Sequence, residues 1–177
     1  VVLAATERNI PSIVFTGSCS DDLRDRLFNL GAIDYLNKDN PHSLNCVIAL
    51  VKRLLNNANW TALVVDDSKT QRSQVSALLQ KLRFRVLEAE GGAEALEILD
   101  REPKIRLVTT DFNMPQMDGC ELTKAIRKKF APDRLAIIGI SGQSSALTAR
   151  FLKCGANDFL IKPFVREEFS CRITQNM

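Results

Sequence analysis

The sequence predicts an α/β protein built on a doubly wound parallel sheet, with part of a second such domain before it. From Thr61 onward, five short apolar runs rich in β-branched residues alternate with helical patterns. Alternation of this kind is typical of parallel strands joined by helices that cover both faces of the sheet. The first 60 residues repeat the later part of this pattern.

The predicted strands are short, and the helices lie between and after them. The strands are expected at residues 63–65, 86–89, 105–110, 137–140 and 158–161. The clearest helix carries Val75, Leu78, Leu79 and Leu82 at the i, i+3, i+4, i+7 spacing of a buried face. Shorter apolar stripes predict further helices around residues 95–99, 122–126 and 165–173. Ser68 stands where a helix N-cap belongs.

An internal repeat relates the two ends of the chain. Residues 31–38 align with residues 155–162 at five identical positions of eight, and residues 13–17 align with residues 138–142. One residue separates the two registers, and general similarity between βα units is the weaker explanation. We therefore expect residues 1–58 to be the C-terminal half of a first domain, beginning inside a helix at residues 1–8. Residues 59–177 are expected to be a complete domain of the same kind.

The incomplete repeat and the first residue predict a longer protein. Half a doubly wound sheet would expose an apolar strand edge, so residues 1–58 are not expected to be stable alone. Either the upstream half is missing from this chain, or something else covers that edge. The chain begins with Val, which indicates that it starts inside a longer protein.

Composition and charge argue for an ordinary globular protein without nucleic-acid or membrane contacts. The chain is 45% apolar and 25% charged, with a net charge of +3. Its densest basic run, residues 127–129, has no interleaved aromatic residues and is best interpreted as a solvated helix face. No apolar run is long enough to span a membrane, and no signal peptide is apparent. The five cysteines form no CxxC pair, so we expect reduced thiols and a cytoplasmic location.

Charged and hydroxyl side chains follow four of the predicted strands. Asp66 and Asp67 follow the first strand, Asp111 the third, Ser141 the fourth and Lys162 the fifth. The carboxyl ends of parallel strands form one edge of the sheet, where α/β proteins bind ligands. A single Asp at such a place is usually a turn or cap residue. Three carboxylates together repel one another unless a divalent cation binds them, so the site predicts a hard metal.

These groups suit the handling of a phosphoryl group with Mg2+. Mg2+ prefers oxygen ligands, and Asp66 and Asp67 are expected to bind it, one of them through water. Asp111 would share the cation and attack a phosphoryl donor to form an aspartyl phosphate. The backbone carbonyl of Asn113 would complete the metal shell. Lys162 and the Ser141 hydroxyl would meet the charge on the phosphoryl oxygens.

The motifs resemble the chemotaxis-type receiver domain of two-component response regulators. They are VVDDS at 64–68, DFNMPQMDG at 111–119, SG at 141–142 and KPF at 162–164. The resemblance covers residue 61 to about residue 173, with each motif at normal spacing. It implies a flavodoxin-like sheet of strand order 2-1-3-4-5. The lysine before Pro163 is expected to precede a cis peptide bond.

The resemblance assigns roles to these residues. Asp111 is the implied phosphoacceptor, supplied by a sensor histidine kinase or a phosphotransfer protein. Phe159 matches the switch aromatic, which would rotate into the space left when Ser141 moves inward. The surface of the receiver's fourth helix, last strand and last helix would then change, and this surface is the family's usual interface, including that of homodimers. Asn113 and Gln143 flank the path of the hydrolytic water and could tune the phosphoryl lifetime.

The first copy matches only the later half of this family. Thr16 corresponds to the switch hydroxyl, Tyr35 to the aromatic and Lys38 to the lysine. Asp39 replaces the usual Pro and adds a negative charge, which favours a degenerate receiver used for docking or dimerisation. His42 is interpreted as a loop or cap residue rather than a phosphodonor.

Three hypotheses of function follow. The leading one is a tandem-receiver segment of a bacterial response regulator that controls an output domain or partner protein, with a diguanylate cyclase as the suggested output. The second is a pseudo-receiver that serves as an interaction module without phosphorylation. The third is a phosphohydrolase with an aspartyl nucleophile. It is disfavoured because such enzymes place nucleophile and acid two residues apart, and residue 68 is Ser. No turnover beyond self-phosphorylation and autodephosphorylation is expected.

Overall fold

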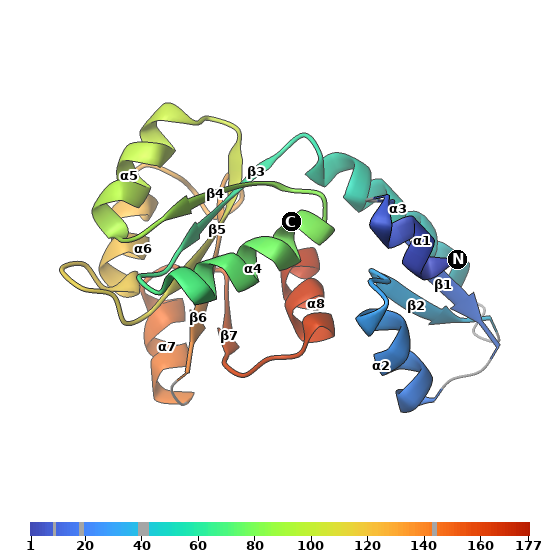
Figure 1. The fold of residues 1–177 in the computed structure, drawn as a ribbon. Helices are drawn as coiled ribbons and strands as arrows, with labels where there is room; N and C mark the ends of the chain where they lie inside the picture. The colour runs from blue at the N-terminus through green and yellow to red at the C-terminus, as the bar shows by residue number, and fades with distance from the viewer. Residues whose placement is uncertain (9, 18–19, 39–42, 143–144) are drawn as a thin grey trace. The chain divides into compact units, whose positions relative to one another are not determined.

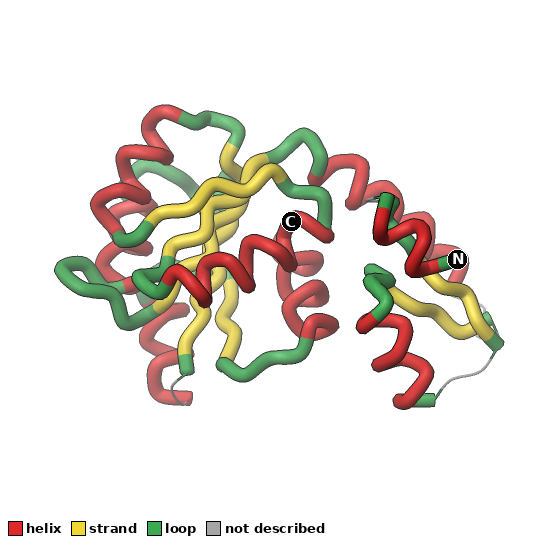
Figure 2. The backbone as a smooth tube through the Cα atoms, in the orientation of Figure 1, coloured by secondary structure: helices red, strands yellow, loops and turns green. Residues whose placement is uncertain are grey.

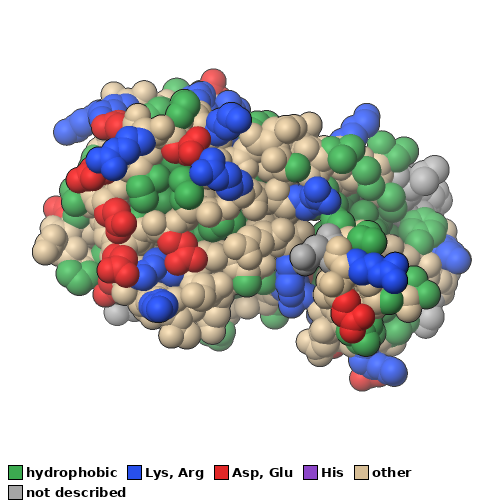
Figure 3. All heavy atoms as spheres, turned by 45° about the horizontal axis from the view of Figure 1, so that its top comes forward, with side chains coloured by type: hydrophobic (Ala, Val, Ile, Leu, Met, Phe, Trp, Pro, Cys, Tyr) green, Lys and Arg blue, Asp and Glu red, His purple; other side chains and the backbone are tan. Residues whose placement is uncertain are grey.

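The computed structural model describes residues 1–8, 10–17, 20–38, 43–142 and 145–177. These residues form two compact units, Val1–Asn56 and Asn57–Met177. No helix within the described ranges is both long and apolar enough to cross a membrane. On the face shown in Figure 3, Lys and Arg side chains are interspersed with Asp and Glu rather than separated by sign.

The second unit is built on a five-stranded parallel sheet of order β4-β3-β5-β6-β7 (Figures 1 and 2). This order is the predicted 2-1-3-4-5 arrangement, and the predicted fold class is confirmed. The strands are β3 (Thr61–Val65), β4 (Arg85–Ala89), β5 (Ile105–Asp111), β6 (Ala136–Ser141) and β7 (Asp158–Ile161).

Helices cover both faces of this sheet. Figure 1 shows α5, α6 and α7 on one face and α4 and α8 on the other. The helices are α4 (Lys69–Lys81), α5 (Gly92–Arg101), α6 (Gly119–Arg127), α7 (Ser145–Lys153) and α8 (Arg166–Asn176). Every residue of β3 and β6 is buried, because both faces of these strands are covered. This burial explains why both strands are nearly continuous apolar runs in the sequence.

Two helix starts show how the sequence sets the boundaries. Asp118 caps α6 in a reciprocal pair with Glu121: each side chain accepts the backbone N–H of the other residue. Ser68 is the N-cap residue of α4, as predicted, but its side chain makes no capping bond. Its backbone N–H instead donates to Asp66 Oδ1 at 2.8 Å, so this turn serves the carboxylate that precedes it.

The first unit holds a two-stranded parallel sheet, β1 (Ile13–Thr16) beside β2 (Asp34–Asn37). Its helices are α1 (Val2–Glu7), α2 (Asp21–Asn29) and α3 (Ser43–Asn57), the last of which ends at the first residue of the second unit. The helix predicted at residues 1–8 is therefore present as α1. A two-strand sheet before a five-strand sheet is consistent with a partial first domain.

The backbone reproduces the internal repeat. In both copies a glycine with positive φ, Gly31 at 97° and Gly155 at 103°, lies shortly before the strand. Only glycine adopts this conformation without strain. Asp34 and Asp158 begin β2 and β7, and their neighbours in the sheet are Ile13 of β1 and Ile138 of β6. The two strand pairs thus share one register.

An equivalent backbone hydrogen bond follows the strand pair in each copy. The amide of Lys38 donates to the carbonyl of Thr16 at 2.8 Å, and the amide of Lys162 donates to the carbonyl of Ser141 at 2.8 Å. These pairs are offset by 124 residues at the lysine and 125 at the hydroxyl residue, since 162 − 38 = 124 and 141 − 16 = 125. The one-residue difference between registers therefore lies between the two strands of each copy, where a helix and its loops absorb it.

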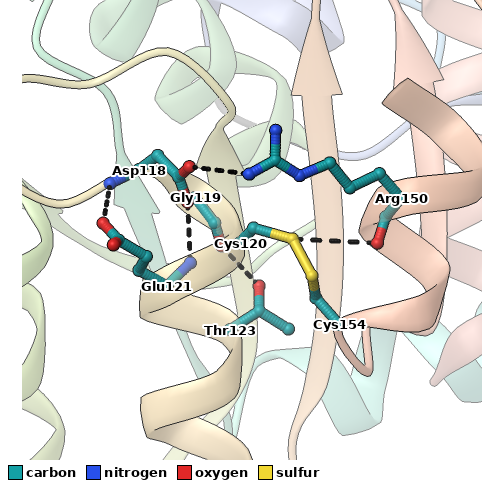
Figure 4. Close-up of a disulfide and its surroundings, with 7 residues drawn as sticks. All are labelled: Asp118, Gly119, Cys120, Glu121, Thr123, Arg150 and Cys154. Carbon is teal, nitrogen blue, oxygen red and sulfur yellow. Dashed lines mark hydrogen bonds and ion pairs between the residues drawn. A yellow bond between two sulfur atoms is a disulfide. The ribbon is translucent and has the colours of Figure 1, made fainter. Parts of the chain in front are cut away.

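A disulfide joins Cys120, near the start of α6, to Cys154, directly after α7 (Figure 4). The expectation that all five cysteines are reduced thiols is wrong for this pair. The two residues are 34 positions apart, so no local spacing motif reveals them, and it is the packing of α6 beside α7 that brings their Cα atoms to 5.6 Å. Cys171 is free and exposed.

An aromatic cluster fills the core beneath α7. The ring of Phe151 lies 5.7 Å from Phe112 and 5.6 Å from Phe159, measured between centroids. Gly139 of β6 makes room for two of these rings, because a Cβ there would lie 2.7 Å from Phe159 and 2.8 Å from Phe151. The apparent break in the apolar run of β6 is thus a packing requirement.

We expect Gly139→Ala to lower the free energy of unfolding by about 1–3 kcal/mol, the usual cost of overpacking a core. Urea denaturation would measure the loss as a lower midpoint. Gly142→Ala is the matched control, because nothing lies within 4 Å of a Cβ at that position. Equal midpoints for the two variants would contradict this interpretation of the aromatic cluster.

Candidate functional site

Three predicted site residues meet at the carboxyl edge of the sheet. Asp66 follows β3, Asp111 ends β5, and Lys162 follows β7. The Lys162 ammonium lies 2.8 Å from Asp111 Oδ1 and 3.2 Å from Asp66 Oδ2. One cation thus bridges two carboxylates that lie 45 residues apart in the sequence, since 111 − 66 = 45.

Backbone N–H groups hold the second oxygen of each carboxylate. Ser68 N–H donates to Asp66 Oδ1 at 2.8 Å, and Asn113 N–H donates to Asp111 Oδ2 at 2.8 Å. Each carboxylate therefore directs one oxygen to the backbone two residues further on and the other to Lys162. This arrangement fixes the orientation of both groups, and it gives the amide of Asn113 a contact that the sequence did not reveal.

Burial shapes the electrostatics of the site. Asp66 is 4% exposed and Asp111 is 9% exposed. Loss of solvation raises the pKa of Asp66 above its ordinary value, because burial disfavours the charged form. The negative charge of Asp111 raises it further, whereas the Ser68 amide and Lys162 act in the opposite direction. Ionisation of Asp66 is therefore less favourable in the folded protein than in water, and a further cation nearby would make it more favourable.

Asp67 does not join this contact group. Its side chain is exposed, next to the buried Asp66. Within the described part of the chain, no three Asp, Glu, Cys or His side chains are arranged to hold a metal ion. The ammonium of Lys162 lies between the two buried carboxylates instead. The structure thus unites two of the three expected carboxylates, and the three-carboxylate metal site stays a prediction.

Two residues of α4 that sequence reasoning missed support the site. Gln71 Oε1 accepts a hydrogen bond from the Lys162 ammonium. Arg72 is 4% exposed, and its guanidinium donates to the carbonyl oxygens of Asp66 at 2.7 Å and Asp67 at 3.2 Å. The same guanidinium pairs with Glu90 at 2.6 Å. Arg72 lies three residues before Val75, on the buried face of α4, so its place on an apolar stripe was the available signal.

The predicted switch residues lie at the end of β6 and near the start of β7. Ser141 is 1% exposed, and its carbonyl accepts the Lys162 amide. Phe159 is 5% exposed and already packs against Phe151, so its ring is inside the protein in this conformation. The predicted inward rotation is not needed to bury it and stays a prediction. The Lys162–Pro163 peptide bond is cis. Gln143 lies outside the described residues.

The first-copy counterparts lie in the first unit. Thr16 ends β1, Tyr35 lies in β2, and Lys38 follows β2 with an exposed side chain. Tyr35 meets Phe28 edge to face with centroids 6.4 Å apart. Asp39 and His42, on which the departure from the family pattern and the loop interpretation rest, lie outside the described residues.

A cavity of about 490 Å³ opens beside the site, between α4 and the segment that follows β7. Lys162 forms part of its wall, so the cavity reaches the group that contacts Asp111. The lining is mostly apolar, with two glutamines from α4. Its residues are Gln71, Gln74, Val75, Leu78, Lys162, Pro163 and Phe164.

Comparison with known proteins identifies the family. Residues 62–174 match the response regulator receiver domain, and the chain therefore belongs to the response regulator receiver family. The chain is similar to the crystal structure of a two-component system response regulator/GGDEF domain protein. That structure is 43% identical with a TM-score of 0.88, and the match covers 99% of this chain and 72% of the other.

Two further relatives show the range of the family. Two-component response regulator ORR7 of Oryza sativa subsp. japonica is 37% identical over 65% of this chain, which spans only 55% of that protein. The CheX–CheY–BeF3–Mg2+ complex from Borrelia burgdorferi is 28% identical with a TM-score of 0.59, covering 66% of this chain and 87% of the other. The predicted receiver resemblance is confirmed.

We expect Asp66→Asn to raise the free energy of unfolding at neutral pH without Mg2+, because it removes a charge whose burial is unfavourable. The raised pKa means that the folded state binds its proton up to a higher pH than the unfolded chain does. Stability of the unmodified protein therefore falls as pH rises from the unfolded to the folded pKa of Asp66.

The gain should accordingly vanish at acid pH, where Asp66 is protonated in both states. Chemical denaturation of both chains from acid to neutral pH would measure it. Asp67→Asn, at the exposed neighbour, is the control and should change stability little. A stability difference that does not vary with pH would contradict the assignment.

Proposed function

We propose that the second unit is a phosphoryl-controlled switch, with Asp111 as the acceptor of a phosphoryl group from a sensor histidine kinase or a phosphotransfer protein. The observation that carries this proposal is the orientation of the Asp111 carboxylate between the Asn113 amide and the Lys162 ammonium, beside an open cavity. A carboxylate held in this way can act as a nucleophile. Lys162 then lies where charge on the incoming phosphoryl oxygens must be balanced.

The donor set fits Mg2+. Asp66, Asp67 and Asp111 carry three negative charges against the one positive charge of Lys162, which leaves two negative charges at the sheet edge. Carboxylates and the Asn113 carbonyl are hard oxygen ligands of the kind that Mg2+ prefers. When bound, the cation supplies charge neutralisation for phosphoryl transfer. The related CheX–CheY complex contains BeF3 and Mg2+, which agrees with this choice.

Each residue of the site has its own part in the proposed reaction. Asn113 N–H and Lys162 orient the Asp111 carboxylate toward the donor, and Gln71 holds the lysine from the side of α4. Arg72 fixes the backbone of the two neighbouring aspartates. Ser141 and Phe159 would report the phosphoryl group to α7, with Asn113 and Gln143 influencing its lifetime.

The cavity beside Lys162 is the proposed docking place for the phosphodonor. A phosphorylated histidine has to approach Asp111 from solvent, and the cavity provides an apolar opening at that edge. Gln71 and Gln74 add hydrogen-bonding groups to an otherwise apolar lining of Val75, Leu78 and Phe164. The mostly apolar lining offers few groups that would bind a charged metabolite, and a protein partner is the proposed occupant.

The response would be read on the surface of α7, β7 and α8. Three apolar side chains are exposed there: Leu152 at 43%, Ile161 at 45% and Val165 at 62%. A homodimer, an output domain or a partner protein could cover them. The similar GGDEF-domain protein supports a diguanylate cyclase output and a cyclic-di-GMP signal in the cytoplasm.

The first unit is proposed to be the C-terminal half of a degenerate receiver, used for docking or dimerisation. The shared strand register and the equivalent Lys38–Thr16 and Lys162–Ser141 hydrogen bonds support this origin. The rival proposal for the whole chain is a pseudo-receiver that is never phosphorylated. Turnover of phosphate esters would instead revive the phosphohydrolase hypothesis.

Acetyl phosphate with Mg2+ should add one phosphoryl group to the chain, and Asp111→Asn should abolish the addition. Mass spectrometry of the intact protein would show both results. Asp133→Asn, which changes an exposed carboxylate, should behave like the unmodified chain. Absence of any adduct on the unmodified chain would favour the pseudo-receiver.

Leu78→Asp should slow phosphoryl transfer from a phosphorylated histidine phosphotransfer protein by about tenfold or more, because a charge would replace an apolar contact at the docking cavity. The rate with acetyl phosphate should stay unchanged, since that donor needs no docking surface. Leu152→Asp, at an exposed leucine on α7, is the matched control. Equal slowing with both donors would place the effect in the site rather than in docking.

A further inference from the structure

The Cys120–Cys154 disulfide closes a loop that contains the predicted switch strand. The 34-residue separation spans most of α6, all of β6 and all of α7. Ser141, at the end of β6, lies inside this closed loop. Any movement of α7 relative to α6 must therefore occur with their backbones linked beside Cys120 and Cys154.

The start of α6 contacts the backbone of the proposed phosphoacceptor. The amide of Gly119 donates to the carbonyl of Phe112 at 2.9 Å. A Cβ on Gly119 would lie only 2.2 Å from the carbonyl oxygen of Asp111, so α6 begins directly against that residue. Cys120 is the next residue, and the disulfide consequently ties α7 to the segment that carries Asp111.

Side chains of α7 span the same boundary beside the disulfide. Figure 4 shows Arg150 reaching Asp118, 3.5 Å from Oδ2. The guanidinium also lies 5.2 Å above the ring of Phe112. Phe151 packs between Phe112 and Phe159. The Arg150–Asp118 ion pair is partly exposed and contributes little to stability. The disulfide is therefore the stronger restraint between α6 and α7.

The site accommodates the reduced thiols as well as the disulfide. Cys120 is 1% exposed within an apolar cluster, where a thiol packs as a small hydrophobe. Its Sγ lies 3.7 Å from the carbonyl oxygen of Arg150, a distance at which a thiol can donate a weak hydrogen bond. Cys154 is half-buried, whereas Cys120 is almost fully buried, so Cys154 is the more accessible of the two residues.

We propose that Cys120 and Cys154 are a redox-controlled pair whose oxidation restrains α7 and opposes the phosphoryl response. This inference rests on the proposed phosphoryl switch. Phe151 lies in α7 three residues before Cys154 and packs between Phe112 and Phe159, so a bond at Cys154 restrains the helix that carries this ring. In a reducing cytoplasm, disulfides are usually transient and often redox-sensing, which agrees with a regulatory role.

The oxidant is a low-molecular-weight disulfide such as glutathione disulfide. The Cys154 thiolate attacks one of its sulfurs, forming a mixed disulfide and expelling one thiolate. The Cys120 thiolate then attacks the Cys154 sulfur and expels the second thiolate. Two electrons pass from the protein thiols to the external disulfide, and the two protein protons end on the two released thiols.

Linkage makes the coupling measurable in both directions. The 177-residue chain, with Cys19, Cys46 and Cys171 changed to Ser, is equilibrated with glutathione and glutathione disulfide. Alkylation and mass spectrometry then give the oxidised fraction, with and without beryllium fluoride and Mg2+ as a phosphoryl mimic. The mimic should shift half-oxidation about fivefold toward the thiols. An unchanged midpoint, or no disulfide at any glutathione ratio, would overturn the proposal.

Calorimetric titration with beryllium fluoride and Mg2+ separates the redox proposal from the proposed phosphoryl switch on which it rests. The mimic should bind the oxidised chain about fivefold more weakly than the reduced chain, by the same linkage. Cys154→Ser should bind it like the reduced chain under both conditions. Normal binding to Cys154→Ser without a redox difference would remove only the redox coupling. Absence of binding to Cys154→Ser would remove the phosphoryl switch itself.

Discussion

The ammonium of Lys162 between Asp66 and Asp111 is the interaction on which the site depends. It joins groups from β3, β5 and β7, which only a parallel sheet brings to one edge. The two carboxylates are almost completely buried, and unpaired charges in such a place are strongly unfavourable. A single lysine therefore makes the clustering of these two acidic groups compatible with a folded protein.

The surrounding backbone gives this pairing its geometry. The amides two residues after each aspartate bind one carboxylate oxygen and leave the other to Lys162. Arg72 holds the carbonyls at the end of β3 from the inner face of α4. The site is thus oriented by turns and one helix as well as by its charged residues, and the proposed reaction at Asp111 would benefit from such fixed donors.

Much of this architecture was predictable from local patterns. Apolar periodicity predicted the five strands, and the family resemblance supplied their order. The residues that follow the strands predicted Asp66, Asp111 and Lys162 as neighbours. Contacts that depend on packing between distant elements could not be predicted. Cys120 meets Cys154 only because α6 and α7 lie side by side. The Arg72 contacts are local, but they depend on the turn between β3 and α4, which sets where its guanidinium meets two backbone carbonyls. The exposed direction of Asp67 likewise depends on how the chain leaves β3.

The hydrogen bonds shared by the two copies depend on the backbone and not on the side chains. Lys38 and Lys162 make the same bond through their backbones, which any residue other than proline can donate. Side chains in one copy can consequently drift without loss of the strand pairing that supports them. If the first unit is the proposed degenerate receiver, its strand pairing would persist even where the side chains that served the reaction have changed.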